Sequence, residues 1–209
     1  MIKAEKTLRI RLLALTISAA CFASCTSSTE IPTISPIESA IPSVSDTVSI
    51  YCQIMPKFGE ERPLILLQDK TELRLYSGDS IDEDMDIARN GLTDGRHESI
   101  FQDFKNKNRG PEPLVDQIAC EGTNIQIIKS EKLAEMFKKD DAWGKIRKVF
   151  PGRPVFVVVS EIGFNESNDR ALVFMHWYRG SLYGSGDYYL MVKQGSEWRI
   201  AKEANKWVS

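Results

Sequence analysis

The chain is poor in histidine, and this scarcity narrows the chemistry that it can carry out. Of its 209 residues only His97 and His176 are histidines. The four cysteines stand at irregular spacings, at Cys21, Cys25, Cys52 and Cys120. A zinc site needs about four such side chains in a recognisable pattern, and these residues form none. We therefore expect no metal and no cofactor.

Motifs of common catalytic sites are missing as well. The sequence has no Gly-x-Ser-x-Gly nucleophile elbow. Its glycine-rich stretch 180–186 matches neither a dinucleotide fingerprint nor a P-loop. Ser160, His176 and Asp187 can be written down as a catalytic set, but no local motif supports them. We therefore expect no catalytic residue and keep an envelope hydrolase that uses the stretch 176–187 only as an alternative function.

An excess of positive charge is also lacking, which argues against nucleic acid as a partner. The chain has 27 basic and 29 acidic residues, a formal net charge of −2. Residues 1–24 contain four basic residues and Glu5, so their removal leaves a net charge of −5. A hydrophobic content of 42% with 9% aromatics is ordinary for a globular domain.

The first 25 residues have the layout of a bacterial lipoprotein signal. Four basic residues precede an apolar stretch at 12–23, which is shorter than the roughly 20 residues that span a bilayer. Residues 22–25, Phe-Ala-Ser-Cys, resemble the lipobox, in which the acylated cysteine becomes the new N-terminus. We expect a signal peptide at 1–24 and a lipid anchor on Cys25. Acylation of Cys21 and an ordinary signal peptide are the alternatives.

The segment after the lipobox reads as a tether. Residues 25–43 are rich in serine, threonine and proline, a composition that favours extended linkers. We expect them to hold a single domain, residues 44–209, beside a membrane of the bacterial cell envelope, on its periplasmic face or at the outer membrane. In that oxidising compartment Cys52 and Cys120 can form a disulfide, although two buried thiols are equally compatible with the sequence.

The first half of the body predicts helices and short strands. The apolar residues at 44–55 fit a helical stripe and also the alternation of a strand, and we favour the helix. A short apolar run predicts a buried strand at 63–68. We expect residues 77–96 to form a surface excursion without a core face. Its acidic cluster, Asp79, Asp82, Glu83, Asp84 and Asp86, mimics the start of a calcium loop. Ile87 occupies the position that needs glycine, so we expect a solvated, charged loop.

The second half predicts two or three helices and then a run of strands. Helical patterns follow near residues 100, 130 and 140, with a strand at 125–128 between them. Four strand-like runs then alternate with short turns, at 155–160, 171–178, 188–193 and 198–202. Short connections force neighbouring strands to be antiparallel. We therefore predict an α+β domain, with helices packed on one face of a mainly antiparallel sheet and a C-terminal four-stranded meander.

The C-terminal third resembles a loose family of uncharacterised bacterial secreted proteins and lipoproteins. The residues that carry the resemblance are Ser-Glu-Ile-Gly-Phe-Asn at 160–165, Ala-Leu-Val at 171–173, Gly-Ser-Gly-Asp-Tyr-Tyr-Leu at 184–190, Trp198, and Trp-Val-Ser at 207–209. Most of them are turn glycines and core aromatics. The resemblance therefore implies a fold and transfers no activity.

The stretch 176–187 is the candidate binding site. It combines aromatic rings, an imidazole and a guanidinium with glycines, and its candidate residues are His176, Tyr178, Arg179, Tyr183 and Asp187. Such side chains can stack on a ligand or hold an anion. The alternative is a glycine-rich turn whose aromatics pack at the end of the sheet. We expect a non-enzymatic binding or interaction module with a protein or glycan partner. An immunity or inhibitor lipoprotein is a further alternative.

Overall fold

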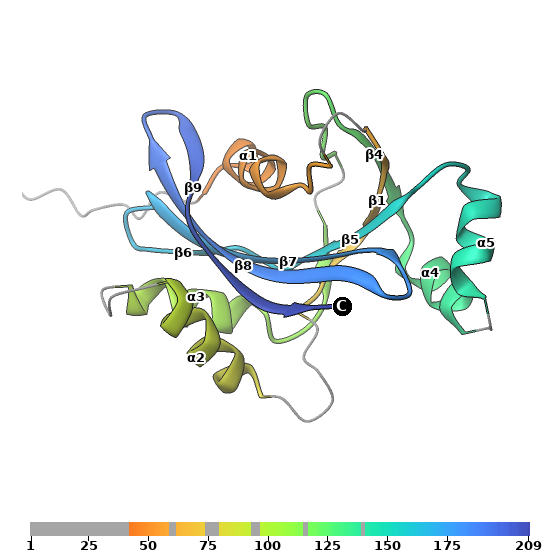
Figure 1. Cartoon of the computed structure of the whole chain (residues 1–209). Helices are drawn as coiled ribbons and strands as arrows, with labels where there is room; N and C mark the ends of the chain where they lie inside the picture. The colour runs from red at the N-terminus through yellow and green to blue at the C-terminus, as the bar shows by residue number, and fades with distance from the viewer. Residues whose placement is uncertain (1–41, 59–61, 74–79, 93–96, 115–116, 139–140) are drawn as a thin grey trace, which may run out of the picture. The chain divides into compact units, whose positions relative to one another are not determined.

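The structure is a computed structural model that describes residues 42–58, 62–73, 80–92, 97–114, 117–138 and 141–209 (Figure 1). The predicted signal peptide, Cys21, Cys25, most of the tether and Asp79 lie outside these residues. Among the residues described, none of the helices has the length and apolar character needed to cross a membrane.

Five helices and nine strands make up the described residues. The helices are α1 (Val44–Ile54), α2 (Ile81–Leu92), α3 (Glu98–Lys107), α4 (Ser130–Phe137) and α5 (Ala142–Val149). The strands are β1 (Leu64–Gln68), β2 (Lys70–Thr71), β3 (Glu112–Pro113), β4 (Asn124–Ile128), β5 (Val155–Val159), β6 (Gly163–Phe164), β7 (Arg170–Gly180), β8 (Tyr183–Gln194) and β9 (Glu197–Val208).

Seven of the strands form one mixed sheet. Its order is β4-β1-β5-β7-β8-β9, and β6 adds to β7. Strand β1 runs parallel to β4 and β5, whereas β5, β7, β8 and β9 follow one another in antiparallel pairs. The α+β class, the mainly antiparallel sheet and the C-terminal meander are therefore confirmed. Strands β2 and β3 form a separate antiparallel pair.

The central strands are apolar on both sides, and this determines how the helices are placed. All five residues of β5, Val-Phe-Val-Val-Val, are buried. Val155, Val157 and Val159 pack in the cluster that contains α1, while Phe156 and Val158 pack with α4 and α5. Successive side chains of a strand point to opposite faces, so both faces of the sheet need cover.

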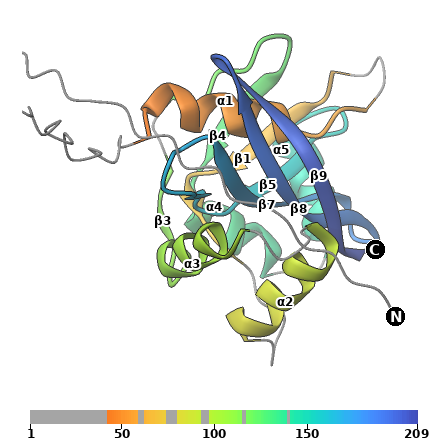
Figure 2. The same cartoon turned by 90° about the vertical axis from the view of Figure 1, so that its left-hand side faces the viewer.

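The expectation that the helices lie on one face holds for four of the five. Helices α2 and α3 cover β7 to β9, and α4 and α5 cover β1 and β5 on that same face. Helix α1 lies on the opposite face, where Ile50, Tyr51 and Ile54 are buried against the sheet (Figures 1 and 2). The single-face prediction is wrong for α1 because the sheet's second face is also apolar.

Within the predicted surface loop, residues 81–92 form helix α2, so the loop prediction is wrong for this described part of the stretch. Ser80 and Glu83 form a reciprocal cap at the start of α2, because each accepts a hydrogen bond from the other's backbone N–H, at 3.2 and 2.8 Å. Met85, Ala88 and Leu92 are buried on one side of the helix. Their spacing is helical, but the surrounding carboxylates hide it in the sequence.

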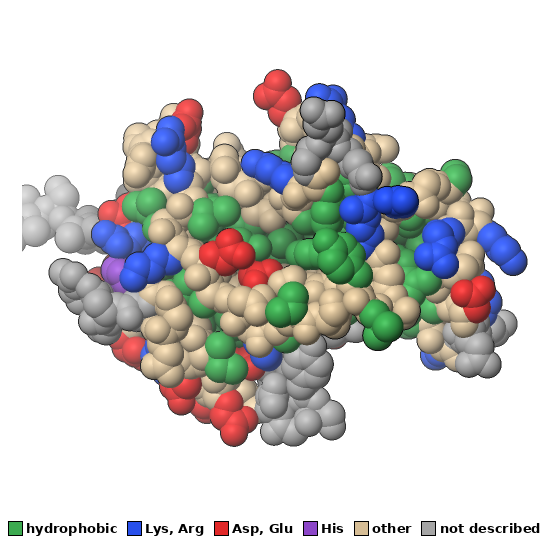
Figure 3. Space-filling view, in the orientation of Figure 1, with side chains coloured by type: hydrophobic (Ala, Val, Ile, Leu, Met, Phe, Trp, Pro, Cys, Tyr) green, Lys and Arg blue, Asp and Glu red, His purple; other side chains and the backbone are tan. Residues whose placement is uncertain are grey.

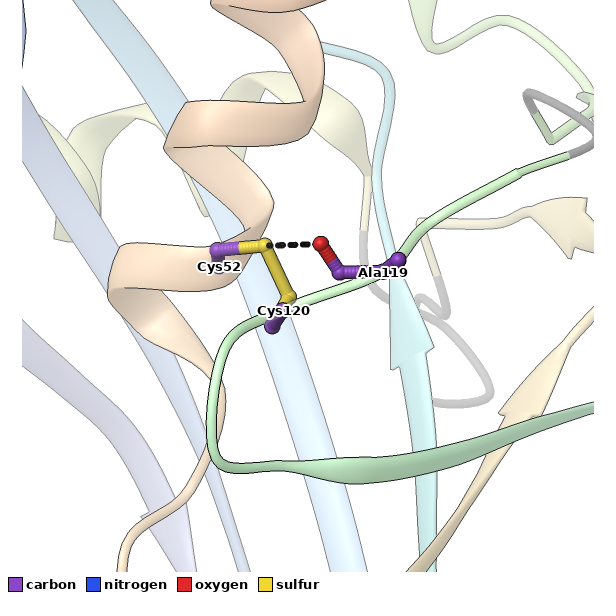
Figure 4. Close-up of a disulfide and its surroundings, with 3 residues drawn as sticks. All are labelled: Cys52, Ala119 and Cys120. Atoms are coloured by element: carbon purple, nitrogen blue, oxygen red, sulfur yellow. Dashed lines mark hydrogen bonds between the residues drawn. A yellow bond between two sulfur atoms is a disulfide. The ribbon is translucent and has the colours of Figure 1, made fainter.

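A disulfide joins Cys52 in α1 to Cys120, which precedes β4 (Figure 4). The two Cα atoms are 5.3 Å apart, and 68 positions separate the residues in the sequence. The Cys52 sulfur also lies 3.8 Å from the carbonyl oxygen of Ala119. The bridge therefore ties the helix that covers one face of the sheet to the segment leading into its edge strand.

Candidate functional site

A cavity opens between α4, α5 and the sheet. Its volume is about 860 Å³, which falls within the usual range for small-molecule sites. The apolar wall comes from several elements, with Leu133 and Phe137 on α4, Trp143 on α5, Phe156 on β5 and Tyr178 on β7. The cavity is thus built from segments far apart in the sequence.

The aromatic side chains of this wall contact one another in series. Phe137 meets Trp143 edge-on at a centroid distance of 6.1 Å and lies 6.0 Å from Phe156. Phe156 stacks on Tyr178 at 6.4 Å, and Tyr178 stacks on Trp207 of β9 at 5.3 Å. Phe137 nevertheless stays 42% exposed. A large aromatic side chain left open in this way is available to a ligand.

A smaller pocket of about 350 Å³ shares Trp143 and Arg147 with this cavity. Arg153 and Arg179 also line it, together with Tyr183 and Pro154. The guanidinium of Arg179 lies 4.8 Å from the centre of the Phe58 ring, a contact that holds the side chain over an aromatic face. Three arginines therefore converge at one end of the aromatic cavity.

The cavity wall also contains two carboxylates, and both have partners in the protein. Glu72 accepts a hydrogen bond of 3.0 Å from the amide of Gln68, a residue that is only 3% exposed. Asp141 caps α5 by accepting 3.0 Å from the backbone N–H of Gly144. A Cβ at Gly144 would overlap the Asp141 carboxylate, so glycine allows this cap to form.

A further carboxylate positions α4. The side chain of Asp69, in the turn after β1, accepts 2.8 Å from the backbone N–H of Ser130 and pairs with Lys129 at 3.1 Å. Burial by itself raises the pKa of Asp69, but the hydrogen bonds from Ser130 and Lys129 outweigh it and lower the pKa. Asp69 thus stays charged and holds the helix start beside the cavity.

The predicted glycine-rich loop is a β-hairpin. Strand β7 continues to Gly180 and β8 begins at Tyr183, so only two residues, Ser181 and Leu182, form the turn. Gly186 lies within β8, where a Cβ would come within 2.1 Å of the Trp207 ring. This glycine makes room for a packed aromatic side chain, which a sequence pattern cannot distinguish from loop flexibility.

Three of the five candidate binding residues line a pocket, and the other two are buried elsewhere in the sheet. Tyr178 lines the large cavity, and Arg179 and Tyr183 line the arginine pocket beside it. His176 is 1% exposed and packs among the rings of Phe174, Tyr178 and Trp207. It shares a face with Leu172 and Phe174, as the alternation of the strand predicts. It lines neither the cavity nor the arginine pocket.

Asp187 has a structural position on the other face of the sheet. It stands opposite Met175 and accepts hydrogen bonds from Ser185 at 2.7 Å and from Asn205 at 2.6 Å. The bond from Asn205 ties β8 to β9. Neither described pocket includes Asp187, so it does not share a site with the residues at the hairpin end.

The possible catalytic set is not brought together. The Ser160 hydroxyl donates to the Glu161 carbonyl and accepts from the Phe174 backbone N–H, both at 2.8 Å. His176 and Asp187 lie on opposite faces of the sheet, because neighbouring Phe174 and Met175 pack in different core clusters. Within the described part of the chain, no group of three or more His, Cys, Asp and Glu side chains is arranged to hold a metal ion.

Sequence reasoning missed most of the residues that form the cavity. Phe137 and Trp143 fall in the helical patterns predicted near residues 130 and 140, which gave no sign of a cavity, and Arg147 and Arg153 did not stand out. The available signal was charge, because residues 129–153 contain eight basic and four acidic side chains, a net charge of +4 in a chain of net charge −2. Several aromatics stand among these charges, and aromatic residues and arginine are enriched at binding interfaces.

No protein-family model, curated protein or solved structure matches the chain.

Proposed function

We propose that the chain is a lipid-anchored protein of the bacterial cell envelope whose folded body binds a small ligand without catalysing a reaction. The observation that carries the binding proposal is the cavity of about 860 Å³, walled by Phe137, Trp143, Phe156 and Tyr178. Its size and partly apolar lining fit a small-molecule site better than a flat protein interface.

Two features support a place outside the cytoplasm. Residues 1–25 have the charge pattern, apolar stretch and Phe-Ala-Ser-Cys motif of a lipoprotein signal. The Cys52–Cys120 disulfide fits an oxidising compartment. We infer that an acyl chain on Cys25 holds the protein at the membrane while the tether leaves the cavity accessible from the aqueous side.

The cavity also shifts the expected partner. A macromolecular partner, protein or glycan, was expected from the hairpin stretch 176–187. Two candidate residues of that stretch, His176 and Asp187, are at most 5% exposed. Tyr178, Arg179 and Tyr183 instead contribute to the cavity and its arginine pocket, so we propose a small ligand as the occupant.

An uncharged fluorescent probe tests the cavity. We expect the full-length protein in detergent to bind N-phenyl-1-naphthylamine, whose emission rises in an apolar site, with a stoichiometry of about one. Ala134→Trp should abolish this binding, because Ala134 lines the cavity from α4 and a large ring would fill it. The measurement is a fluorescence titration with detergent blanks.

A matched control is Ala201→Trp, the same substitution at an exposed position of β9 outside the described pockets. It should bind the probe as the wild type does. Equal titrations for wild type and Ala134→Trp, or no saturable binding by the wild type, would contradict the binding proposal.

A further inference from the structure

The arginine pocket places positive charge at one end of the apolar cavity, and this arrangement indicates the class of ligand. Resting on the proposed binding function, we propose that the ligand is an amphipathic anion. Its apolar body fills the aromatic cavity, and its carboxylate or phosphate group meets Arg147, Arg153 and Arg179.

The first argument is the composition of the smaller pocket. Its described lining contains three arginines and no acidic side chain. Arginine stays protonated at any physiological pH and presents donors in a planar fork that matches carboxylate and phosphate oxygens. Arg147 and Arg153 are exposed residues. An anion at this position gains charge-assisted hydrogen bonds.

The second argument is the distribution of charge over the molecule. The segment 129–153, which contains α4 and α5, has a net charge of +4, whereas the whole chain has −2. In Figure 3, Lys and Arg side chains lie on the side of α4 and α5 and also elsewhere on this face, whereas acidic side chains gather over α2. This asymmetry favours the approach of an anion to the cavity and disfavours a cation.

The third argument sets the orientation of the ligand. Shared Trp143 and Arg147 connect the arginine pocket to the aromatic cavity. Glu72 and Asp141 also line the larger cavity, and a carboxylate placed beside them would be repelled. The anionic group therefore belongs at the arginine pocket, with the apolar body against Phe137, Phe156 and Tyr178.

Ligands with the same chain and different head groups test this assignment. Dodecanoate, dodecanol and dodecyltrimethylammonium, each below its micelle concentration, compete with N-phenyl-1-naphthylamine for the full-length protein. We expect dodecanoate to bind at least about tenfold more tightly than the ammonium compound, a difference of about 1.4 kcal/mol. Raising the salt concentration should narrow that difference, because Arg147 and Arg153 are exposed.

Arginine variants locate the head group. Arg147→Gln and Arg153→Gln should each weaken dodecanoate binding about five- to tenfold and leave dodecanol binding unchanged. Arg199→Gln is the matched control, because Arg199 is an exposed arginine of β9 that pairs with Glu197 and lines none of the described pockets. Its dodecanoate affinity should equal that of the wild type.

The outcomes separate the two proposals. Probe binding together with equal affinities for the anionic and cationic chains, or with no effect of Arg147→Gln and Arg153→Gln, would overturn the anion assignment and leave the cavity function standing. Loss of all binding would overturn the function itself. 2-Naphthoate and dodecyl phosphate, run in the same assay, distinguish an aromatic acid from an acyl chain and a carboxylate from a phosphate.

Discussion

At the scale of single residues, Asp46 links the start of α1 to the hairpin between β8 and β9. Its backbone N–H donates 3.1 Å to the Ser43 hydroxyl, which caps the helix. Its carboxylate accepts hydrogen bonds from Lys193 at 2.7 Å and from Trp198 at 2.8 Å. Burial by itself raises the pKa of Asp46, but these bonds and that from Ser43 outweigh it and lower the pKa to about 2.

This shift predicts a pH-dependent loss of stability. Because the pKa falls from 3.8 to about 2 on folding, the charged form of Asp46 stabilises the folded state above about pH 4. That contribution, up to about 2 kcal/mol, disappears as the pH falls from 4 through 2. We expect Asp46→Asn to lower the free energy of unfolding by a similar amount at pH 7, measured by urea denaturation.

The comparison with a second variant isolates the effect. Asp86 is a 70% exposed aspartate of α2 that pairs with Arg89, so Asp86→Asn should change stability by less than about 0.5 kcal/mol. The difference between wild type and Asp46→Asn should shrink toward pH 2. A difference that is the same at pH 7 and pH 2 would show that the carboxylate's charge is not responsible.

At the scale of elements, α2 is attached to the sheet by a buried ion pair. Asp84 of α2 pairs with Lys206 of β9, and their side chains are 1% and 3% exposed. The Tyr188 hydroxyl donates 2.8 Å to the same carboxylate. Burial and the neighbouring Asp84 charge raise the pKa of Tyr188, so its phenol stays protonated and remains a donor.

Removal of one partner should cost far more than removal of both. Lys206→Met leaves the Asp84 carboxylate buried without its cation, and we expect it to lower the free energy of unfolding by about 3 kcal/mol or more. Asp84→Asn combined with Lys206→Met should cost less than the sum of the two single variants. Denaturation of the four proteins of this cycle provides the measurement.

Lys202→Met is the control for this cycle, because Lys202 is an exposed lysine on the same strand. It should change stability by less than about 0.5 kcal/mol. Strictly additive effects of the two substitutions at Asp84 and Lys206 would mean that the pair does not couple α2 to the sheet.

Sequence patterns located some elements and missed others for a common reason. The helix at 44–55 and the four C-terminal strands were predicted because each has a local apolar period, and α1 and the meander confirm them. Helix α2 was missed, because Asp84 is buried only through its contacts with Tyr188 and Lys206, more than a hundred positions away. A contact with a residue far away in the sequence does not change the local spacing of apolar residues, so the sequence pattern does not reveal it.

At the scale of the whole molecule, the position of the anchor remains a prediction. We expect full-length protein expressed in bacteria to incorporate labelled palmitate and to fractionate with membranes. Cys25→Ser should abolish both, because the lipobox cysteine is the only acceptor in this proposal. Cys21→Ser is the matched control and should keep the label. Gel fluorography and the intact mass of the purified protein provide the measurements.

Label retained in Cys25→Ser and lost in Cys21→Ser would move the anchor to the alternative cysteine. A wild-type protein that is unlabelled and recovered from the cytosol would contradict the envelope location. The ligand experiments would stand in either case, because they depend on the cavity alone.

The fold class followed from the sequence, because the spacing of apolar residues shows the order of helices and strands and the alternation within each strand. Alternation along the strand at 171–178 also puts His176 on the same face as Leu172 and Phe174. Residue types also limited the chemistry, because a chain with two distant histidines and no nucleophile motif offers few catalytic sets. These properties depend on composition and near neighbours, which a sequence states directly.

Only the tertiary structure decided which of these residues meet. It joined Cys52 to Cys120, put α1 on the face of the sheet opposite the other helices, and separated His176 and Asp187 from Arg179. It also gathered a cavity from α4, α5, β5 and β7, with three arginines at one end. Such contacts depend on the order of the strands, on the side of the sheet to which each side chain points, and on where each helix packs. These features arise from packing between distant segments, so no periodic pattern along the chain reveals them.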